Sequence, residues 1–145
     1  MDTIKINSGI VRLQIDRDGE LSEISFNPED TEFIERVYAL MAELEQKEAE
    51  FKTREAELAK DESEDANGML RNFPARLALM KEICQYIKDR IDLVFGLGTS
   101  QKAFGEANSF DMFEQFFDGI TPYIKKARSK RLNEYREAPV RNVME

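Results

Sequence analysis

The sequence predicts a single α+β domain, in which a small antiparallel sheet is followed by a mainly helical part. Apolar residues alternate with polar ones from the start of the chain to Phe26, which is typical of half-buried strands. After Phe26 they recur at every third or fourth position, which is typical of helices. The chain has 145 residues, of which 41% are hydrophobic, so it can bury one core.

Residues 1–27 are expected to form a three-stranded antiparallel meander. The stretches TIKIN, IVRLQID and LSEISF each place their apolar residues on one face, and the turn sequences NSG and DRDGE separate them. DRDGE also contains part of a calcium loop. Counted from Asp16, however, the EF-hand pattern requires glycine where Leu21 stands and glutamate where Asn27 stands. A hairpin turn is therefore the prediction for this stretch.

A long charged helix is predicted over residues 28–61, with Asn27 or Thr31 as its N-cap. Its apolar residues are spaced by three and four, but its second half contains few of them. Two interpretations stay open for this polar half, an exposed arm or a contact with another chain. The residues that we assign to self-association are Phe33, Val37, Leu40, Leu44, Phe51 and Leu58.

A linker is expected over residues 62–69, followed by a helical core over 70–136. The first core helix ends at about residue 95, and Asn72 and Pro74 suit its cap and first turn. We expect this helix to be central, because apolar residues such as Ile83 widen its uninterrupted seam. The seam consists of Leu70, Phe73, Leu77, Met80, Cys84, Ile87, Ile91 and Val94.

The stretch FGLGTSQKAFG has the composition of a phosphate-binding loop, but its spacing does not fit one. The sixth residue counted from Gly96 is Gln101, where both the Walker and the dinucleotide patterns require glycine, and no serine or threonine follows Lys102. A helix also precedes the glycines, whereas both motifs follow a buried strand. We therefore expect a helix end at Gly96, a turn, and a short helix capped by Thr99 or Ser100.

An aromatic-rich helix is predicted to begin near Ser109. Its phenylalanines recur at helical spacing, which is typical first of a core and second of a contact surface. Pro122 lies inside the pattern and predicts a kink or a break near Thr121. Residues 137–145 are expected to form a loose tail.

The composition excludes several kinds of chemistry. The chain has no histidine and one cysteine, which removes Ser–His and Cys–His catalysis, the usual zinc sets and an internal disulfide. We expect Cys84 to be a buried thiol. Two acidic pairs could hold Mg²⁺, although solvated helix faces are the favoured interpretation; they are Asp89 with Asp92 and Asp111 with Glu114. No catalytic residue, metal or cofactor is predicted.

The net charge of −8 argues against nucleic acid as a partner. No stretch is apolar enough for a transmembrane helix, and the first residues lack the apolar core of a signal peptide, so we expect a cytoplasmic protein without a membrane contact. The charge is uneven, with a net of −12 over residues 16–65 and +4 over residues 121–145. This asymmetry indicates either solvated helix faces with a basic tail or a docking surface.

The order YIKDRIDLVFGLGTSQKAFGEANSFDMFEQFFDGITPYI resembles small proteins encoded in the tail-gene clusters of phages and prophages of Gram-positive bacteria. The shared pattern is an ID..FG.GTS...FG core, then a phenylalanine-rich helix, then a basic tail. These proteins look like tail assembly chaperones of long-tailed phages. The clearest match runs from Ile87 to about Arg131.

The resemblance implies a non-enzymatic protein of the bacterial host cytoplasm that binds the tape-measure protein, the tail tube protein or both during tail morphogenesis. Self-association as a homo-oligomer is compatible with it. The alternatives are a structural minor tail or head–tail connector protein and, with less support, a small regulatory or nucleotide-binding module. We assign the partner contact to Phe95, Phe104, Phe110, Phe113, Phe117, Lys125, Lys126, Arg128, Lys130 and Arg131.

Overall fold

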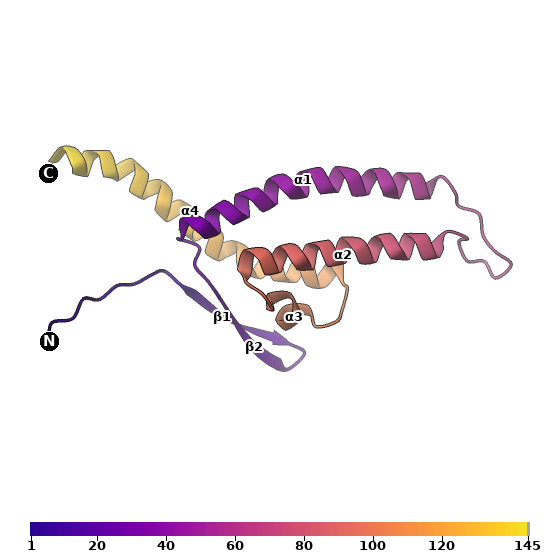
Figure 1. Ribbon diagram of the computed structural model, residues 1–145, viewed down its shortest axis with the longest axis horizontal. Coiled ribbons are helices and arrows are strands. Elements are labelled where there is room, and N and C mark those ends of the chain that lie inside the picture. The colour runs from indigo at the N-terminus through magenta and orange to yellow at the C-terminus, as the bar shows by residue number, and fades with distance from the viewer. Residues whose placement is uncertain (145) are drawn as a thin grey trace.

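The computed structural model describes the backbone of residues 1–144 and the side chains of residues 1–130. Over these residues the chain forms an antiparallel β-hairpin and four helices, which confirms the α+β class. The elements are β1 (Val11–Arg17), β2 (Glu20–Phe26), α1 (Thr31–Ala59), α2 (Phe73–Phe95), α3 (Thr99–Phe104) and α4 (Phe110–Met144). Helices α1 and α2 lie antiparallel and extend together to one side, while the β-hairpin and α3 gather near the C-terminal end of α2 (Figure 1).

The β-hairpin has the predicted tight turn. Leu13 lies opposite Ile24 in the ladder, and the turn between the strands uses Asp18 (φ 55°) and Gly19 (φ 92°). Positive φ at both central residues is what a two-residue type I′ turn requires. The Asp16 carboxylate accepts a hydrogen bond from the Gly19 N–H at 2.8 Å, so this side chain serves the turn.

The predicted third strand is wrong, because the sheet of the described residues has two strands. Residues 1–10 belong to no helix or strand, and Ile4 and Ile6 are 87% and 85% exposed. Alternating apolar residues give a segment one apolar face, but the segment forms a strand only when it lies beside the edge of another strand and pairs with it. The Asn27 side-chain amide donates to the Ser8 carbonyl at 2.7 Å, and the residues before Ser8 run on away from β1 (Figure 1).

Helix α1 is continuous over 29 residues, and its N-cap is Asp30. The Asp30 carboxylate accepts a hydrogen bond from the Glu32 N–H at 2.9 Å. The predicted caps Asn27 and Thr31 are therefore wrong. Asn27 instead forms the turn before the helix, because its side-chain oxygen accepts from the Glu29 N–H at 3.1 Å.

The C-terminal end of α1 is capped by two side chains of the following segment. The Asn72 amide donates to the Leu58 carbonyl at 2.7 Å, and the Arg76 guanidinium donates to the carbonyls of Leu58 and Asp61 at 3.1 Å. Asn72 does occupy the N-cap position of α2, as predicted, but its side chain makes no capping bond to α2. It satisfies carbonyls that the end of α1 leaves without helical partners.

A sharp corner joins α2 to α3. Gly96 (φ 113°) ends α2 and Gly98 (φ 89°) is the N-cap of α3, so both occupy the region that favours glycine. The Asp92 carboxylate accepts hydrogen bonds from the Ser100 N–H at 2.8 Å and the Ser100 hydroxyl at 2.9 Å. The expected cap at Thr99 or Ser100 is therefore wrong, since Asp92 supplies the capping oxygen from eight residues earlier.

Helix α4 runs through Pro122 without a break, so the predicted break near Thr121 is wrong; the kink stays a prediction. The Thr121 hydroxyl donates to the Phe117 carbonyl at 2.6 Å on the exposed side of the helix. The helix also extends past residue 136, where the loose tail was expected to begin.

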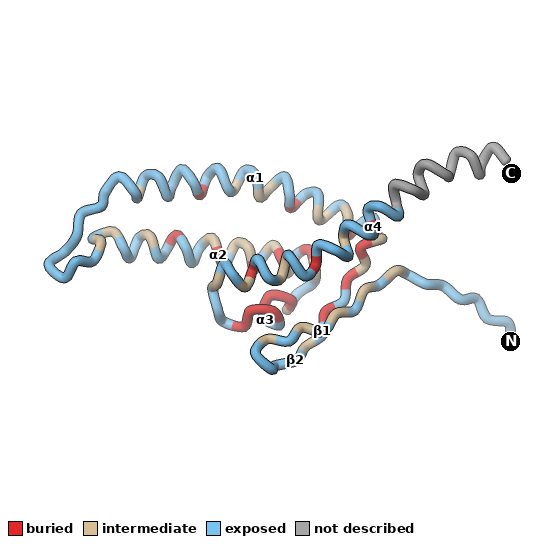
Figure 2. Tube along the Cα trace, turned by 180° about the vertical axis from the view of Figure 1, so that it is seen from behind, coloured by how far each residue is buried: buried red, intermediate tan, exposed pale blue. Residues whose placement is uncertain are grey.

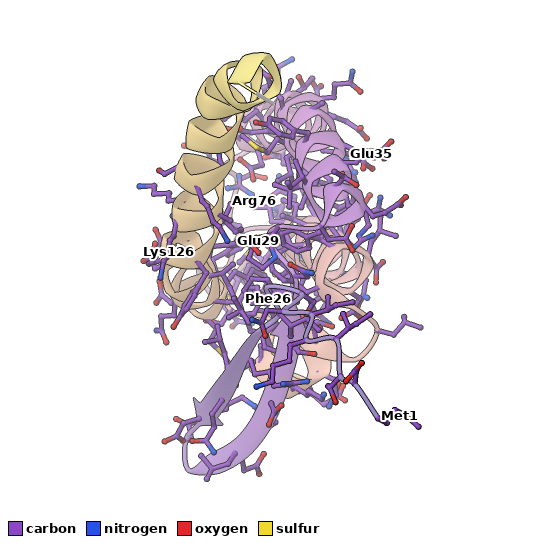
Figure 3. The ribbon with its side chains drawn as sticks, turned by 90° about the vertical axis from the view of Figure 1, so that its left-hand side faces the viewer. Met1, Phe26, Glu29, Glu35, Arg76 and Lys126 are labelled. Atoms are coloured by element: carbon purple, nitrogen blue, oxygen red, sulfur yellow. The ribbon has the colours of Figure 1, made fainter. Side chains whose placement is uncertain are left out.

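The core lies where the β-hairpin and the N-terminal half of α1 meet α2, α3 and α4 (Figure 2). In the part of the chain with described side chains, it divides into two clusters, and Phe95 and Phe116 pack against both. Phe26 lies where the hairpin meets the helices (Figure 3). Cys84 is buried, as predicted. The buried members are Ile24, Phe26, Phe33, Leu40, Val94 and Ile120 in one cluster, and Cys84, Ile91, Ala103, Phe104 and Phe113 in the other.

Candidate protein-binding groove

The aromatic residues assigned to a partner contact differ in exposure. Phe104 and Phe113 are 1% and 3% exposed, and their ring centroids lie 4.8 Å apart in the core. Phe95 and Phe117 are half-buried and pack against the same clusters. Phe110, at the start of α4, is 44% exposed. Most of the predicted aromatic surface therefore stabilises the fold, and Phe110 is its most accessible member.

The basic residues assigned to a partner lie on the exposed side of α4. Lys125, Lys126, Arg128 and Lys130 are exposed, and Lys126 lies on the outer side of the helix (Figure 3). The Lys130 ammonium donates to the Glu29 carboxylate at 2.6 Å. Arg131 lies outside the residues whose side chains are described. These cations are thus separate from the buried phenylalanines with which the prediction grouped them.

The residues assigned to self-association are covered by their own chain. Phe33, Leu40 and Phe51 are 2%, 9% and 8% exposed, while Val37, Leu44 and Leu58 are half-buried. Helix α2 lies along this side of α1, so the seam is occupied within the chain. Of the six residues, Leu44 and Phe51 also line a groove beside α2, described next.

A groove lies on one side of the α1–α2 hairpin, next to the start of α4. We call it the hairpin groove. Its volume is about 350 Å³, and residues of three helices form it. The lining residues are Leu44, Lys47, Glu48, Phe51, Lys52 and Glu55 of α1, Ile83, Tyr86 and Ile87 of α2, and Phe110 of α4.

The floor of the hairpin groove is aromatic. The Phe51 and Tyr86 rings pack edge to face with centroids 6.0 Å apart. The Lys47 ammonium lies 5.5 Å from the Tyr86 centroid and 5.9 Å from the Phe51 centroid, within cation–π range of both. Burial, together with the nearby Glu43 carboxylate, raises the pKa of Tyr86, so its phenol is neutral at physiological pH.

Ion pairs connect the two helices on both sides of these rings. The Arg54 guanidinium donates to both Glu82 carboxylate oxygens, at 2.8 and 2.7 Å, and Arg90 donates to both Glu43 oxygens, at 3.2 and 3.1 Å. Arg54 uses both terminal nitrogens, and this bidentate geometry fixes orientation as well as distance, whereas Arg90 shares Nη1 between the two Glu43 oxygens. The walls of the groove are therefore held at a defined separation before any partner binds.

An exposed apolar stripe continues the groove along α2. Phe73, Leu77 and Met80 are 43%, 38% and 49% exposed and lie on the same helical face as Ile83 and Ile87. Over the rise of a helix this face spans about 20 Å, or four turns. Apolar side chains in a row of this length are typical of a contact surface rather than of a solvated helix.

Sequence reasoning predicted the width of this apolar face but not its use. Ile83 was predicted to widen the apolar face of a helix that is central to the core. The contribution of Tyr86 was missed, because its position depends on where Phe51 lies across the α1–α2 hairpin. Such a pairing between two helices has no signature in either helix alone.

The acidic pairs do not converge on a metal site. Asp92 is engaged by Ser100, and Asp89 accepts a hydrogen bond from Gln85 at 2.8 Å. Asp92 was predicted to lie on a solvated helix face, whereas its carboxylate is bound by Ser100. Among the described residues, no three acidic, cysteine or histidine side chains come together as metal ligands would. None of the described helices combines the length and the apolar character that crossing a bilayer requires.

The fold and the groove define a small α+β protein with a preformed apolar surface on a helical hairpin. Residues 20–143 match a protein family, and the chain therefore belongs to the family of unknown function DUF6673. No curated protein and no solved structure matches the chain.

Proposed function

We propose that this chain is a non-enzymatic tail assembly chaperone of a long-tailed phage or prophage, and that it binds the tape-measure protein through the hairpin groove. The resemblance of residues 87–131 suggests this role. The observation that supports this binding site is the hairpin groove together with the stripe of Phe73, Leu77 and Met80, whose side chains are each more than a third exposed. A chaperone for a long helical protein needs a surface of this kind.

The geometry favours an amphipathic helix as the occupant. A helix docks by placing apolar residues, spaced by three and four, into a groove between two other helices. The floor of Phe51 and Tyr86 and the exposed ring of Phe110 provide the apolar contacts. The rim carries both signs of charge, because Glu48 and Lys52 form an ion pair at 2.8 Å, so a partner with mixed charges is accommodated.

The exposed cations of α4 are a second contact surface in this proposal, suited to tail tube subunits. Lys125, Lys126 and Arg128 lie outside the hairpin groove. Their positive charges attract an acidic partner, and this attraction weakens as salt is added. The two partners can therefore bind at the same time.

Co-expression with the tape-measure protein, followed by pull-down, tests the proposal. The wild-type chain should retain the tape-measure protein. Met80→Asp and Phe110→Asp should reduce recovery at least tenfold, because each places a charge on an apolar contact. Met41→Asp is the matched control, since Met41 is 57% exposed on α1 and lies outside the groove.

Two results would count against the proposal. If both proteins are soluble and the wild-type chain does not retain the tape-measure protein, the proposed partner is wrong. If Met41→Asp impairs recovery as much as Met80→Asp, the groove is not the binding site. Mass spectrometry of purified particles separates a chaperone, which is absent, from a structural tail or connector protein, which is present in stoichiometric amount.

A further inference from the structure

Strand β1 has an open edge. It pairs with β2 on one side, and no other strand among the described residues pairs with its second side. Its residues alternate between half-buried and exposed, with Leu13 and Ile15 turned toward the core. An open edge presents a row of backbone N–H and C=O groups that are ready to pair with another strand.

A second groove lies beside this edge. It is formed between β1, α3 and α4 and has a volume of about 550 Å³. We call it the edge groove, and it is separate from the hairpin groove. Its apolar residues include Leu13, Ile15, Phe104, Met112, Phe116 and Ile120. A strand added to β1 would therefore place alternate side chains into an apolar groove.

The chain itself contains an unpaired segment with the required pattern. Ile4 and Ile6 alternate with polar residues and are almost fully exposed, at 87% and 85%. Residues 3–7 are kept away from their own β1 edge, because Ser8 is bound by Asn27 and the chain then runs outward. Met1 lies away from the body of the molecule (Figure 3).

We propose that residues 3–7 of a second copy add to β1 as an antiparallel third strand, and that two copies exchange these strands reciprocally. Ile4 then lies opposite Ile15 and Ile6 opposite Leu13, so both isoleucines enter the edge groove. In a dimer with twofold symmetry this contact forms twice, so the open β1 edge of each copy is paired by a strand of the other copy.

The alternation of the two segments supports this register. In it, Lys5 lies opposite Gln14 on the outer face, with Asp16 on one diagonal and Arg12 on the other, so the long lysine side chain stays in solvent. A shift by one residue would turn both isoleucines to solvent and Lys5 into the apolar groove. This strand exchange also explains why residues 3–7 have the alternating pattern of a strand although they form no strand in the single chain.

Mixed disulfide trapping tests the exchange directly. In a Cys84→Ala background, one chain carries Lys5→Cys and a second, size-tagged chain carries Gln14→Cys. Mild oxidation of the mixture should produce a crosslinked heterodimer. Replacing Gln14→Cys with Glu23→Cys is the control, because Glu23 lies opposite Gln14 on β2 and is too far from the added strand.

A single chain that carries both Lys5→Cys and Gln14→Cys distinguishes strand exchange between two copies from folding back within one chain. Crosslinking within single chains only would overturn the proposal, since it would mean that the segment folds back onto its own edge. No crosslink, or equal crosslinking of the Glu23→Cys control, would overturn it as well.

Light scattering after size exclusion gives an independent test. The wild-type chain should have twice the monomer mass, and the double variant Ile4→Asp with Ile6→Asp should have the monomer mass. Leu97→Asp, which changes a residue that is 95% exposed on the α2–α3 corner, should stay dimeric. Equal masses for the wild-type chain and the double variant would contradict strand exchange, whatever the outcome for the hairpin groove.

Discussion

Gly96, Gly98 and Asp92 determine the direction of the chain between α2 and α3. The two glycines adopt positive φ angles, and the Asp92 carboxylate holds the first turn of α3 through Ser100. The glycine-rich composition thus serves a corner that places Phe104 in the core. A Cβ added at Gly96 would meet no atom within 4 Å, so the main cost of a side chain there comes from the positive φ angle.

The variant Gly96→Val is therefore expected to destabilise the fold by about 1–3 kcal/mol, the usual cost of a strained backbone conformation. Urea unfolding followed by circular dichroism measures this loss. Gly119→Ala is the opposite control, because Gly119 is helical with open space around it, and it should stabilise by about 0.5–1 kcal/mol. An unchanged free energy of unfolding in Gly96→Val would mean that the corner tolerates another conformation.

The Cys84 thiol is expected to be unreactive in the folded chain. Burial raises its pKa, so the fraction of reactive thiolate is small at any given pH. Its modification by a disulfide reagent at pH 8 should be at least ~100-fold slower than in urea, because it requires opening of the core. Reaction at the unfolded rate would contradict the packing of α2 against α3 and α4.

Some of these residue roles were visible in the sequence and others were not. The burial of Cys84 followed from its apolar neighbours at helical spacing, and the helix end at Gly96 followed from glycine preference. The role of Asp92 did not, because its partner is eight residues away around a corner. A local sequence pattern predicts the helix or strand to which a residue belongs. A capping bond to a residue in another helix depends on how the helices are arranged in space, which the pattern does not contain.

The α1–α2 hairpin is held differently along its length. Near the β-hairpin it joins the aromatic core, whereas its far end relies on Leu58 and Leu79, on the Arg54–Glu82 pair and on the caps from Asn72 and Arg76. Exposed ion pairs contribute little to stability compared with buried apolar area. The far end is therefore less stable than the part of the α1–α2 hairpin next to the β-hairpin.

Hydrogen exchange should detect this difference. Amides in the last two turns of α1 and the first two turns of α2 are expected to exchange through local opening. Amides around Cys84 and Ile91 should exchange only on global unfolding, because these residues are buried at 1% and 0% exposure. Equal protection along both helices would show that the hairpin opens as a unit with the core.

The Arg54–Glu82 pair predicts a pH dependence. The hydrogen bonds from Arg54 hold the pKa of Glu82 below its ordinary value. This contribution to stability is present above that ordinary pKa and is lost as the pH falls through the lower, folded value. Glu82→Gln should therefore melt slightly below the wild-type chain at pH 7 and equally at pH 3, and a difference that grows in acid would contradict the pairing.

Periodicity predicted the helices well and the strands less well. The spacing of apolar residues located α1, α2 and α4, since each helix carries its own pattern. The third strand failed because residues 3–7 have the pattern but run outward from Ser8, away from the open edge of β1. The α1 seam was assigned to another copy because a sequence does not say which helix covers it, and here α2 does.

The whole molecule separates three surfaces by chemistry. The hairpin groove is apolar and lies on the acidic helical hairpin, the edge groove lies between β1 and α4, and the exposed cations lie further along α4. The sequence is also uneven in charge, with a net of −12 over residues 16–65 and of +4 over residues 121–145. The proposed binding of more than one partner would use these surfaces separately.

The exchange footprint of the complex tests the proposed function most directly. Hydrogen exchange is measured for the chain alone and with saturating tape-measure protein. Binding in the hairpin groove should slow exchange in residues 44–55, 73–87 and at the start of α4, and should leave β1 unchanged. Saturable binding with no slowing in these segments, or with slowing confined to β1 and the outer side of α4, would contradict the assignment.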